Sequence, residues 1–232
     1  MRTTYARIGA ASGAVCVLAV MIGNGLALAG WSGETNGPAV LADFQRELSV
    51  VNMVGLSMEL LGWVALVVFL GYLYRVLQLA EGPTGWLAPV AFGSGLIMVC
   101  IKLGSVAPFT AAWYRRDDLT VTTATTLRDL GDALFVVSGW ATGLLVATAA
   151  GSALVSGVLP RWLGWFGMVS GVATLVAGTV GIMDPAHYIP LPFLAGLLWI
   201  LITSVVLTVR ASRVQQHELA EPTVPTGVAA RQ

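Results

Sequence analysis

Charged residues are scarce in this chain, and their scarcity excludes a water-soluble protein. Only 10% of the 232 residues are Asp, Glu, Lys or Arg, whereas a soluble domain usually carries about 25%. Hydrophobic residues make up 56% of the chain, and the mean hydropathy is +0.81. The formal net charge is zero and the pI is near 6.7, so the chain has no basic excess with which to bind nucleic acid. We therefore expect the lipid bilayer, and no nucleic acid, as a partner.

Residues that hold metals and cofactors are few as well, with two cysteines and two histidines in the whole chain. Cys16 and Cys100 lie inside apolar runs, which favours neither a disulfide framework nor a zinc site. His187 lies in a loop and His217 in the tail, so paired histidines cannot hold a haem between helices. The HExxH, CxxC, GxSxG and P-loop motifs are absent. We expect no metal and no common cofactor, and a non-enzymatic protein is favoured over an enzyme.

Six apolar runs are each long enough to form a helix that crosses the hydrocarbon core, which needs roughly 20 residues. They are about Ile8–Gly30, Ser49–Tyr74, Trp86–Phe109, Asp132–Ser156, Trp162–Met183 and Leu191–Val209. These runs predict an all-α fold, a polytopic transmembrane bundle of six spans that forms a single domain over residues 1–210. Residues 211–232 contain Gln, Pro and Gly, which predicts a disordered cytoplasmic tail.

The distribution of basic residues predicts the orientation of the six spans. With the N-terminus inside, the cytoplasmic segments hold Arg2, Arg7, Arg75, Arg161, Arg210, Arg213 and Arg231, and the outer loops hold Arg46, Arg115, Arg116 and Arg128. Because cytoplasmic loops are enriched in Lys and Arg, this bias predicts that the N- and C-termini are both cytoplasmic. The abundance of Ala, Gly, Val and Arg is typical of a GC-rich bacterial genome. We therefore expect a multi-pass protein of the bacterial inner (cytoplasmic) membrane.

Two segments allow two interpretations each. Arg2 and Arg7, followed by an apolar stretch and Ala27-Leu28-Ala29, resemble a signal peptide with its cleavage site. The apolar run is long for a signal peptide, so an uncleaved first span is favoured, and cleavage would leave five spans in the same orientation. Residues 38–48 (PAVLADFQREL) form either a short amphipathic helix on the outer surface or an irregular loop.

Lys102 is the most informative residue, because it is the only charged residue of the third apolar run, as Glu59 is of the second. An ionisable group at membrane depth is costly, so each residue is a candidate functional group. With a rise of 1.5 Å per residue, Glu59 lies roughly 15 Å and Lys102 roughly 10 Å below the outer ends of their helices. A lysine side chain is long enough to cover that difference and reach Glu59; the alternative is that Lys102 snorkels to the outer surface and is unpaired.

Three further polar residues lie near Glu59 and Lys102 in this reading. Asp132 begins the fourth span, Asn24 lies at a similar height on the first span, and Asn52 shares a helix face with Glu59. The cluster allows two interpretations. One is a buried Glu59–Lys102 ion pair that sets the helix register. The other is a chamber in which a carboxylate handles protons or a lysine binds an anionic ligand.

Small residues spaced four apart indicate where helices approach closely. Gly9/Gly13, Gly139/Gly143 and Gly167/Gly171 are such pairs. We expect these faces to lie inside the bundle, although the Gly139 and Gly143 face also suits contact with a partner subunit.

The turn after the fourth span carries a resemblance to a known family. Residues 159–167 read LPRWLGWFG, which is similar to the LPRwLGwlG turn of a bacterial inner-membrane family of about six helices. The end of the second span, residues 72–77 (YLYRVL), resembles the same family. That family is catalogued only as a domain of unknown function, so the resemblance implies a six-helix fold and no activity, cofactor or site residue.

Three hypotheses for function follow from these observations. The first is an integral membrane protein that binds or transports a small or lipophilic molecule in an outward-facing cavity near Glu59. The second is an accessory or structural membrane subunit without a ligand. The third is a small membrane-embedded enzyme in which an acid, Glu59 or Asp132, acts on a lipid-like substrate, as in membrane-bound terpene cyclases.

Overall fold

The computed structural model describes residues 2–184 and 187–220, and over these ranges all regular secondary structure is helical, without strands. The elements are α1 (Arg2–Ala27), α2 (Gly37–Gln45), α3 (Val50–Glu81), α4 (Leu87–Gly104), α5 (Val106–Tyr114), η1 (Arg116–Asp118), α6 (Val121–Ser156), α7 (Arg161–Met183) and α8 (Leu191–Ala220). Six segments, with α4 and α5 counted together, are long and apolar enough to cross a membrane. The prediction of an all-α bundle with six such helices is confirmed.

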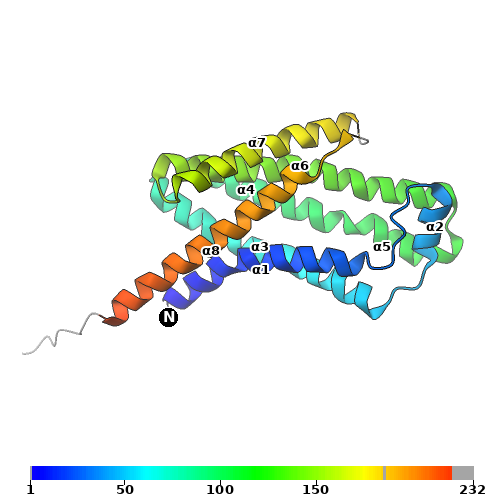
Figure 1. Cartoon of the computed structure of the whole chain (residues 1–232), viewed down its shortest axis with the longest axis horizontal. Coiled ribbons are helices and arrows are strands. Elements are labelled where there is room, and N and C mark those ends of the chain that lie inside the picture. Colours follow the sequence, from blue (N-terminus) through cyan, green and yellow to red (C-terminus); the bar gives the residue numbers. More distant parts are fainter. Residues whose placement is uncertain (1, 185–186, 221–232) are drawn as a thin grey trace, which may run out of the picture.

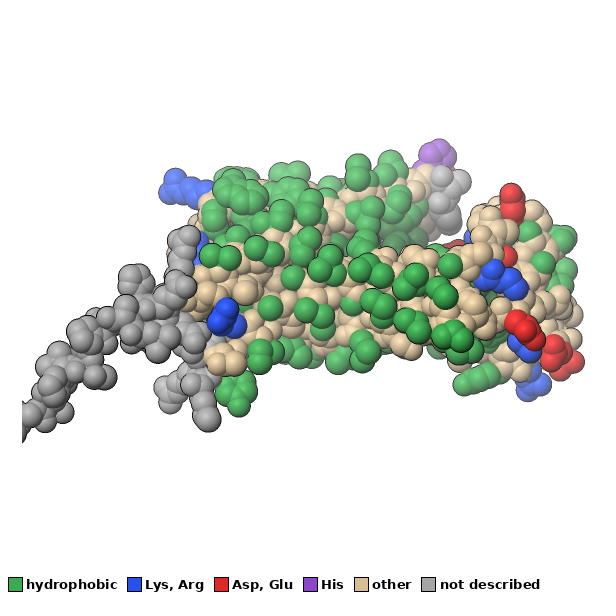
Figure 2. All heavy atoms as spheres, turned by 60° about the horizontal axis from the view of Figure 1, so that its bottom comes forward, with side chains coloured by type: hydrophobic (Ala, Val, Ile, Leu, Met, Phe, Trp, Pro, Cys, Tyr) green, Lys and Arg blue, Asp and Glu red, His purple; other side chains and the backbone are tan. Residues whose placement is uncertain are grey.

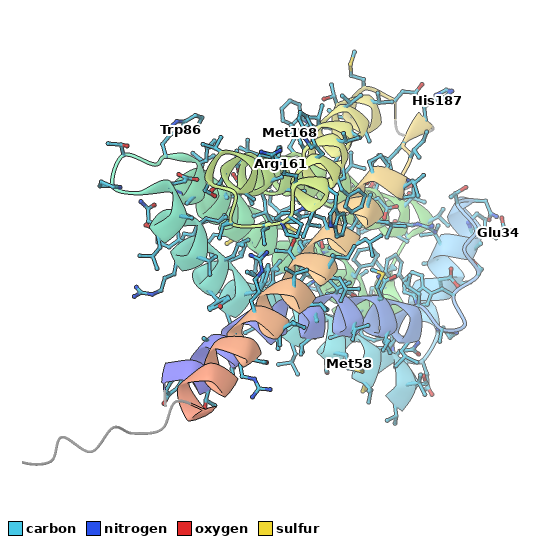
Figure 3. All side chains as sticks on the ribbon, turned by 60° about the vertical axis from the view of Figure 1, so that its left-hand side comes forward. Glu34, Met58, Trp86, Arg161, Met168 and His187 are labelled. Atoms are coloured by element: carbon cyan, nitrogen blue, oxygen red, sulfur yellow. The ribbon has the colours of Figure 1, made fainter. Side chains whose placement is uncertain are left out.

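The long helices run roughly along one direction, and α8 crosses the others obliquely (Figure 1). The N-terminus and the C-terminal half of α8 lie at one end of the bundle, whereas α2 and α5 lie at the other, which we call the α2 end. Figure 3 shows Glu34 and His187 toward the α2 end and Trp86 far from it. Apolar side chains cover the long face seen in Figure 2, and acidic side chains gather at the α2 end.

Glycines allow two helix pairs to touch backbone to backbone. A Cβ atom added to Gly23 of α1 would lie 2.6 Å from the backbone nitrogen of Glu59 and 2.7 Å from the carbonyl oxygen of Gly55, both on α3. A Cβ atom on Gly143 of α6 would lie 2.7 Å from the carbonyl oxygen of Gly171 on α7. Because only glycine permits such distances, these residues determine which helices are neighbours.

Helix α6 begins about three turns before the Asp132 start that the sequence predicts. The Thr120 hydroxyl caps its first turn by accepting a hydrogen bond of 3.2 Å from the backbone nitrogen of Thr123. With 36 residues, α6 is about 54 Å long, well beyond the hydrocarbon thickness. Hydropathy detects only the apolar part of α6. The added turns contain both apolar and charged residues: Ala124 is buried against α2, whereas Arg128 is charged.

The third predicted span is interrupted, which the sequence analysis did not foresee. Helix α4 ends at Gly104, and α5 begins at Val106 and runs to Tyr114, beyond the predicted end at Phe109. Pro108 has no N–H with which to continue the hydrogen-bond ladder to Gly104. Just before this break, the Ser105 hydroxyl donates a hydrogen bond to the Lys102 backbone carbonyl at 2.8 Å. Lys102 therefore lies in the last turn of a helix, where the helix dipole favours a cation.

Two remaining boundaries also bear on the predictions. The sequence allows either a helix or a loop at residues 38–48. In the structure most of these residues belong to α2, and the Asn36 side chain is its N-cap. Helix α8 continues to Ala220, so residues 211–220 are helical where a disordered tail is predicted. No proline or glycine precedes Pro222 in that stretch, so nothing in it stops the helix. The rest of the predicted tail lies outside the described residues.

Candidate functional site

The Lys102 ammonium is enclosed by aromatic rings from three other helices. Its Nζ atom lies 3.4 Å from the ring centre of Phe135 on α6, 4.4 Å from that of Phe193 on α8 and 5.8 Å from that of Trp63 on α3. The residue is only 3% exposed. Cation–π attraction is strongest where water is excluded, so the rings replace part of the lost hydration of the ammonium. We call Lys102, Phe135, Phe193 and Trp63 the lysine cage.

The Glu59 carboxylate lies near the lysine cage without joining it. Glu59 is half-buried on α3, next to the close approach of α1 at Gly23. It interacts electrostatically with Lys102. Both residues belong to the described part of the chain, and no ion pair joins them there. The buried ion pair, one of the two interpretations of this cluster, is therefore not formed, and aromatic rings surround the ammonium instead.

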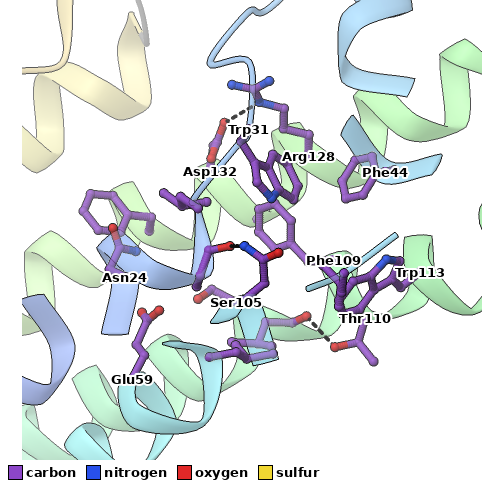
Figure 4. Close-up of a pocket in the computed structure, with 18 residues that line it drawn as sticks. Asn24, Trp31, Phe44, Glu59, Ser105, Phe109, Thr110, Trp113, Arg128 and Asp132 are labelled. Atoms are coloured by element: carbon purple, nitrogen blue, oxygen red, sulfur yellow. Dashed lines mark hydrogen bonds and ion pairs between the residues drawn. The ribbon is translucent and has the colours of Figure 1, made fainter. Parts of the chain in front are cut away.

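A cavity of about 300 Å³ lies beside Glu59, at the α2 end of the bundle. Apolar and aromatic side chains form most of its wall, and its charged or amide members are Asn24, Asn52, Glu59, Arg128 and Asp132. In Figure 4 the Glu59 carboxylate points toward Asn24 on one side of the cavity, and Trp31, Phe109 and Trp113 lie on the other side. Lys102 does not line the cavity, but Phe135 of its cage does. The cavity volume is at the lower end of the range for small-molecule sites.

Asn52 lies at the edge of the same cavity, but its side chain is fully engaged in helix capping. Its amide nitrogen donates to the carbonyl oxygens of Leu26, Ala27 and Ala29 at 3.2, 3.0 and 3.0 Å, where α1 ends. Its amide oxygen accepts from the backbone nitrogen and the hydroxyl of Ser49, the N-cap of α3. Asn52 therefore joins the end of α1 to the start of α3 and has no group left for a ligand.

Asp132 and Asn24 occupy the cavity wall in different ways. The Asp132 side chain is 65% exposed, and its Oδ2 lies 3.7 Å from Nε of Arg128, one turn earlier on α6. The Arg128 guanidinium also donates to the Glu34 carbonyl at 2.6 Å. The exposed Asn24 side chain forms no hydrogen bond with any described residue. Of the five predicted residues, the structure thus brings Glu59, Asn24, Asp132 and Asn52 to one cavity and leaves Lys102 behind its wall.

An aromatic cluster that no sequence pattern predicts lines the α2 end of the cavity. The ring centres of Trp31, Phe44 and Phe109 lie 5.4 to 6.3 Å apart. Phe44 is buried in a small second hydrophobic core with Val40 of α2, Ala112 of α5 and Ala124 of α6. These residues lie in a loop and two short helices. The apolar face of residues 38–48 was the one sequence signal that pointed to this cluster. The packed rings make this part of the cavity wall well ordered.

A second hollow, of about 360 Å³, adjoins the first at the α2 end. Leu48 and Trp113 line both hollows. The second hollow also contacts Glu47, Met53 and Arg116. Leu48 and Trp113 therefore lie between the two hollows.

The glycine face that suits a partner subunit is occupied within the chain. A Cβ atom added to Gly139 would lie 3.7 Å from Cα of Gly178 on α7, and Gly143 contacts Gly171 of the same helix. This face of α6 is therefore covered by α7. Over residues 2–184 and 187–220, no group of three or more His, Cys, Asp or Glu side chains is arranged to hold a metal ion.

The fold and the cavity define a class: a helical protein with six helices suited to cross a membrane and a ligand-sized chamber at one end of the bundle. Comparison with known proteins found no matching family model, no matching curated protein and no matching solved structure. The resemblance of residues 159–167 to the inner-membrane family remains a prediction.

Proposed function

We propose that this protein binds a small, largely apolar molecule in the cavity beside Glu59. The observation that carries the proposal is the Glu59 carboxylate, which lines an apolar cavity of about 300 Å³ without a hydrogen bond or ion pair to any described residue. A carboxylate in apolar surroundings is costly unless it is paired. A ligand that donates to Glu59 and fills the aromatic space would supply the missing partner.

The surroundings of the cavity support binding over a purely structural role. Gly23 of α1 leaves no room for a side chain between the helices beside Glu59, so the α3 backbone that carries the carboxylate is fixed against α1. The Trp31, Phe44 and Phe109 cluster lines the cavity with rigid rings that offer a large apolar contact area. A largely apolar wall with a small number of polar groups is typical of small-molecule sites.

The binding proposal is tested with two tryptophan substitutions on the same helix. Leu56→Trp places an indole in the cavity, whereas Leu61→Trp places it on an exposed face of α3. Purified protein in lipid nanodiscs is screened for compounds that raise its thermal stability, because a bound ligand stabilises the folded state. We expect a compound that stabilises the wild type and Leu61→Trp but not Leu56→Trp. A compound that stabilises all three equally would bind elsewhere and contradict the proposal.

We further propose that the protein lies in the bacterial inner membrane with both termini in the cytoplasm, so that the cavity belongs to the outer half of the bilayer. The excess of arginine in the segments opposite the α2 end supports this orientation. The test uses a membrane-impermeant maleimide on cells, with Cys16 and Cys100 replaced by serine. Tyr114→Cys at the α2 end should be labelled and Thr84→Cys at the other end should not; the reverse result would invert the orientation.

A further inference from the structure

We infer that the ligand of the cavity is an organic cation, a small ammonium compound with an apolar body. This inference rests on the proposed function and names the ligand class of the same site. Three features of the described residues carry it: the charges on the cavity wall, the aromatic rings around it, and the way the protein binds its own ammonium group at Lys102.

The charges on the wall leave one carboxylate without a close partner. Arg128, Asp132 and Glu59 are the charged residues that line the cavity. Arg128 and Asp132 form an ion pair with each other, and Arg128 is further held by the Glu34 carbonyl. Glu59 remains as the negative group that faces the cavity. A ligand that carries a cation can pair with Glu59, whereas an anion would meet its repulsion and would have to separate Arg128 from Asp132.

The rings on the wall suit the same ligand. Trp31, Phe44, Phe109, Trp113 and Phe135 all line the cavity. Aromatic faces carry partial negative charge and attract cations, most strongly where water is excluded. Recognition of quaternary ammonium groups by such rings is an established use of this interaction. The carboxylate on one side of the cavity suits the cationic group of such a ligand, and the rings on the other side suit its apolar body.

The lysine cage shows that this part of the bundle holds an ammonium group by its rings. The ring centre of Phe135 lies 3.4 Å from the Lys102 Nζ atom, and Phe135 also lines the cavity. One ring therefore belongs to both the lysine cage and the cavity wall. Lys102 repels a bound cation, but it lies behind the wall and forms no ion pair with Glu59. A ligand cation in direct contact with Glu59 would lie closer to that carboxylate than to Lys102, which does not line the cavity. Because Coulomb energy falls with distance, the contact with Glu59 outweighs the field of Lys102.

The experiment compares two probes of equal shape that differ by one charge: phenethyltrimethylammonium and its carbon isostere (3,3-dimethylbutyl)benzene. Binding is measured by isothermal titration into wild-type protein in nanodiscs, with empty nanodiscs as the blank. We expect the cation to bind about tenfold more tightly than the isostere. Glu59→Gln should remove this preference by weakening the cation and leaving the isostere unchanged, whereas the matched control Glu34→Gln, outside the cavity, should retain it.

A second variant distinguishes a cation site from an anion site. Lys102→Met preserves an unbranched side chain inside the cage and removes the positive charge. The cation should bind this variant more tightly than the wild type, because a repulsive charge is gone. Weaker binding of phenethyltrimethylammonium to Lys102→Met would overturn the inference, since it would mean that the field of Lys102 assists the ligand.

The outcomes separate the ligand class from the site itself. Equal binding of the two probes to the wild type, abolished by Leu56→Trp, would overturn the cation inference and leave the cavity as a site for neutral molecules. Binding of neither probe, together with no stabilising compound in the screen, would overturn both. A cation preference that survives Glu59→Gln would also overturn the inference, because it would place the charge recognition away from Glu59.

Discussion

The ammonium of Lys102 lies 3.4 Å from the centre of the Phe135 ring, on a neighbouring helix, and not in an ion pair with Glu59. This relationship separates the two charged groups that the sequence places at similar depth. Phe135, Phe193 and Trp63 hold the lysine, and the carboxylate is left to face the cavity. The rings thus surround the lysine, and Glu59 is the candidate functional group that lines the cavity.

Lys102→Met should leave the free energy of unfolding unchanged or raise it by about 1 kcal/mol, since burying a charge costs more than its contacts return unless it is paired. Methionine fills a similar volume and makes favourable contacts with aromatic rings. Unfolding of the purified protein by a denaturing detergent would measure the change. Lys102→Ala is the matched control, expected to lose about 2 kcal/mol or more because it leaves a void. A large loss in Lys102→Met would show that the charge itself holds the bundle together.

Asn52→Ala should destabilise the protein by about 2 kcal/mol, because several carbonyl groups at the end of α1 and the cap of α3 lose their partner at once. Asn24→Ala is the matched control, since that side chain is exposed and forms no hydrogen bond with the described residues. Thermal unfolding of both variants checks this difference. Equal stability of the two variants would contradict the capping role of Asn52.

Gly143→Ala should destabilise the bundle by about 1 to 3 kcal/mol, because the added methyl group would meet the carbonyl of Gly171 on α7. Gly93→Ala on α4 provides the control, since a Cβ atom there has no neighbour within 4 Å. Alanine favours a helix over glycine by up to about 1 kcal/mol, so that variant should be neutral or slightly stabilised. Denaturant titration distinguishes the two. Tolerance of Gly143→Ala would mean that α6 and α7 can separate without cost.

Trp113→Ala should speed the exchange of a ligand between the cavity and solution, because Trp113 and Leu48 separate the cavity from the adjoining hollow. We expect the association and dissociation rates of a bound fluorescent probe to rise together, with a smaller change in affinity, in stopped-flow measurements. Trp165→Ala removes an exposed tryptophan from α7 and serves as the control. Unchanged rates in Trp113→Ala would exclude this partition as the route of access. This prediction depends on the proposed function.

The helical architecture was largely predictable from the sequence, because each span is a local property. A run of apolar residues such as 162–183 needs no knowledge of its neighbours to be identified, and the structure has a helix at Arg161–Met183. The early start of α6 was not predictable in this way, since its added turns mix charged and apolar residues. They are recognisable only once α2 and α5 are seen to cover their apolar side.

The candidate site was predictable in its members and not in its contacts. Rarity alone marks Lys102 and Glu59, because one charge in an apolar span is conspicuous. Their relative position depends on how each helix is rotated about its axis, and that rotation is determined by contacts such as Gly23 with Glu59 and Gly95 with Leu70. The rings of the lysine cage come from three helices far apart in the chain. No spacing in the sequence connects them.

The sequence by itself determined that this chain has six apolar helices, and which few polar residues lie within them, because apolar length and charge are read residue by residue. Only the tertiary structure decided that Lys102 is held by aromatic rings, that Asn52 serves as a cap, and that Glu59 faces a cavity. Each of those outcomes depends on side chains from different helices meeting at one place. Packing determines such meetings, through the backbone contacts that glycine allows and the volumes that neighbouring side chains fill.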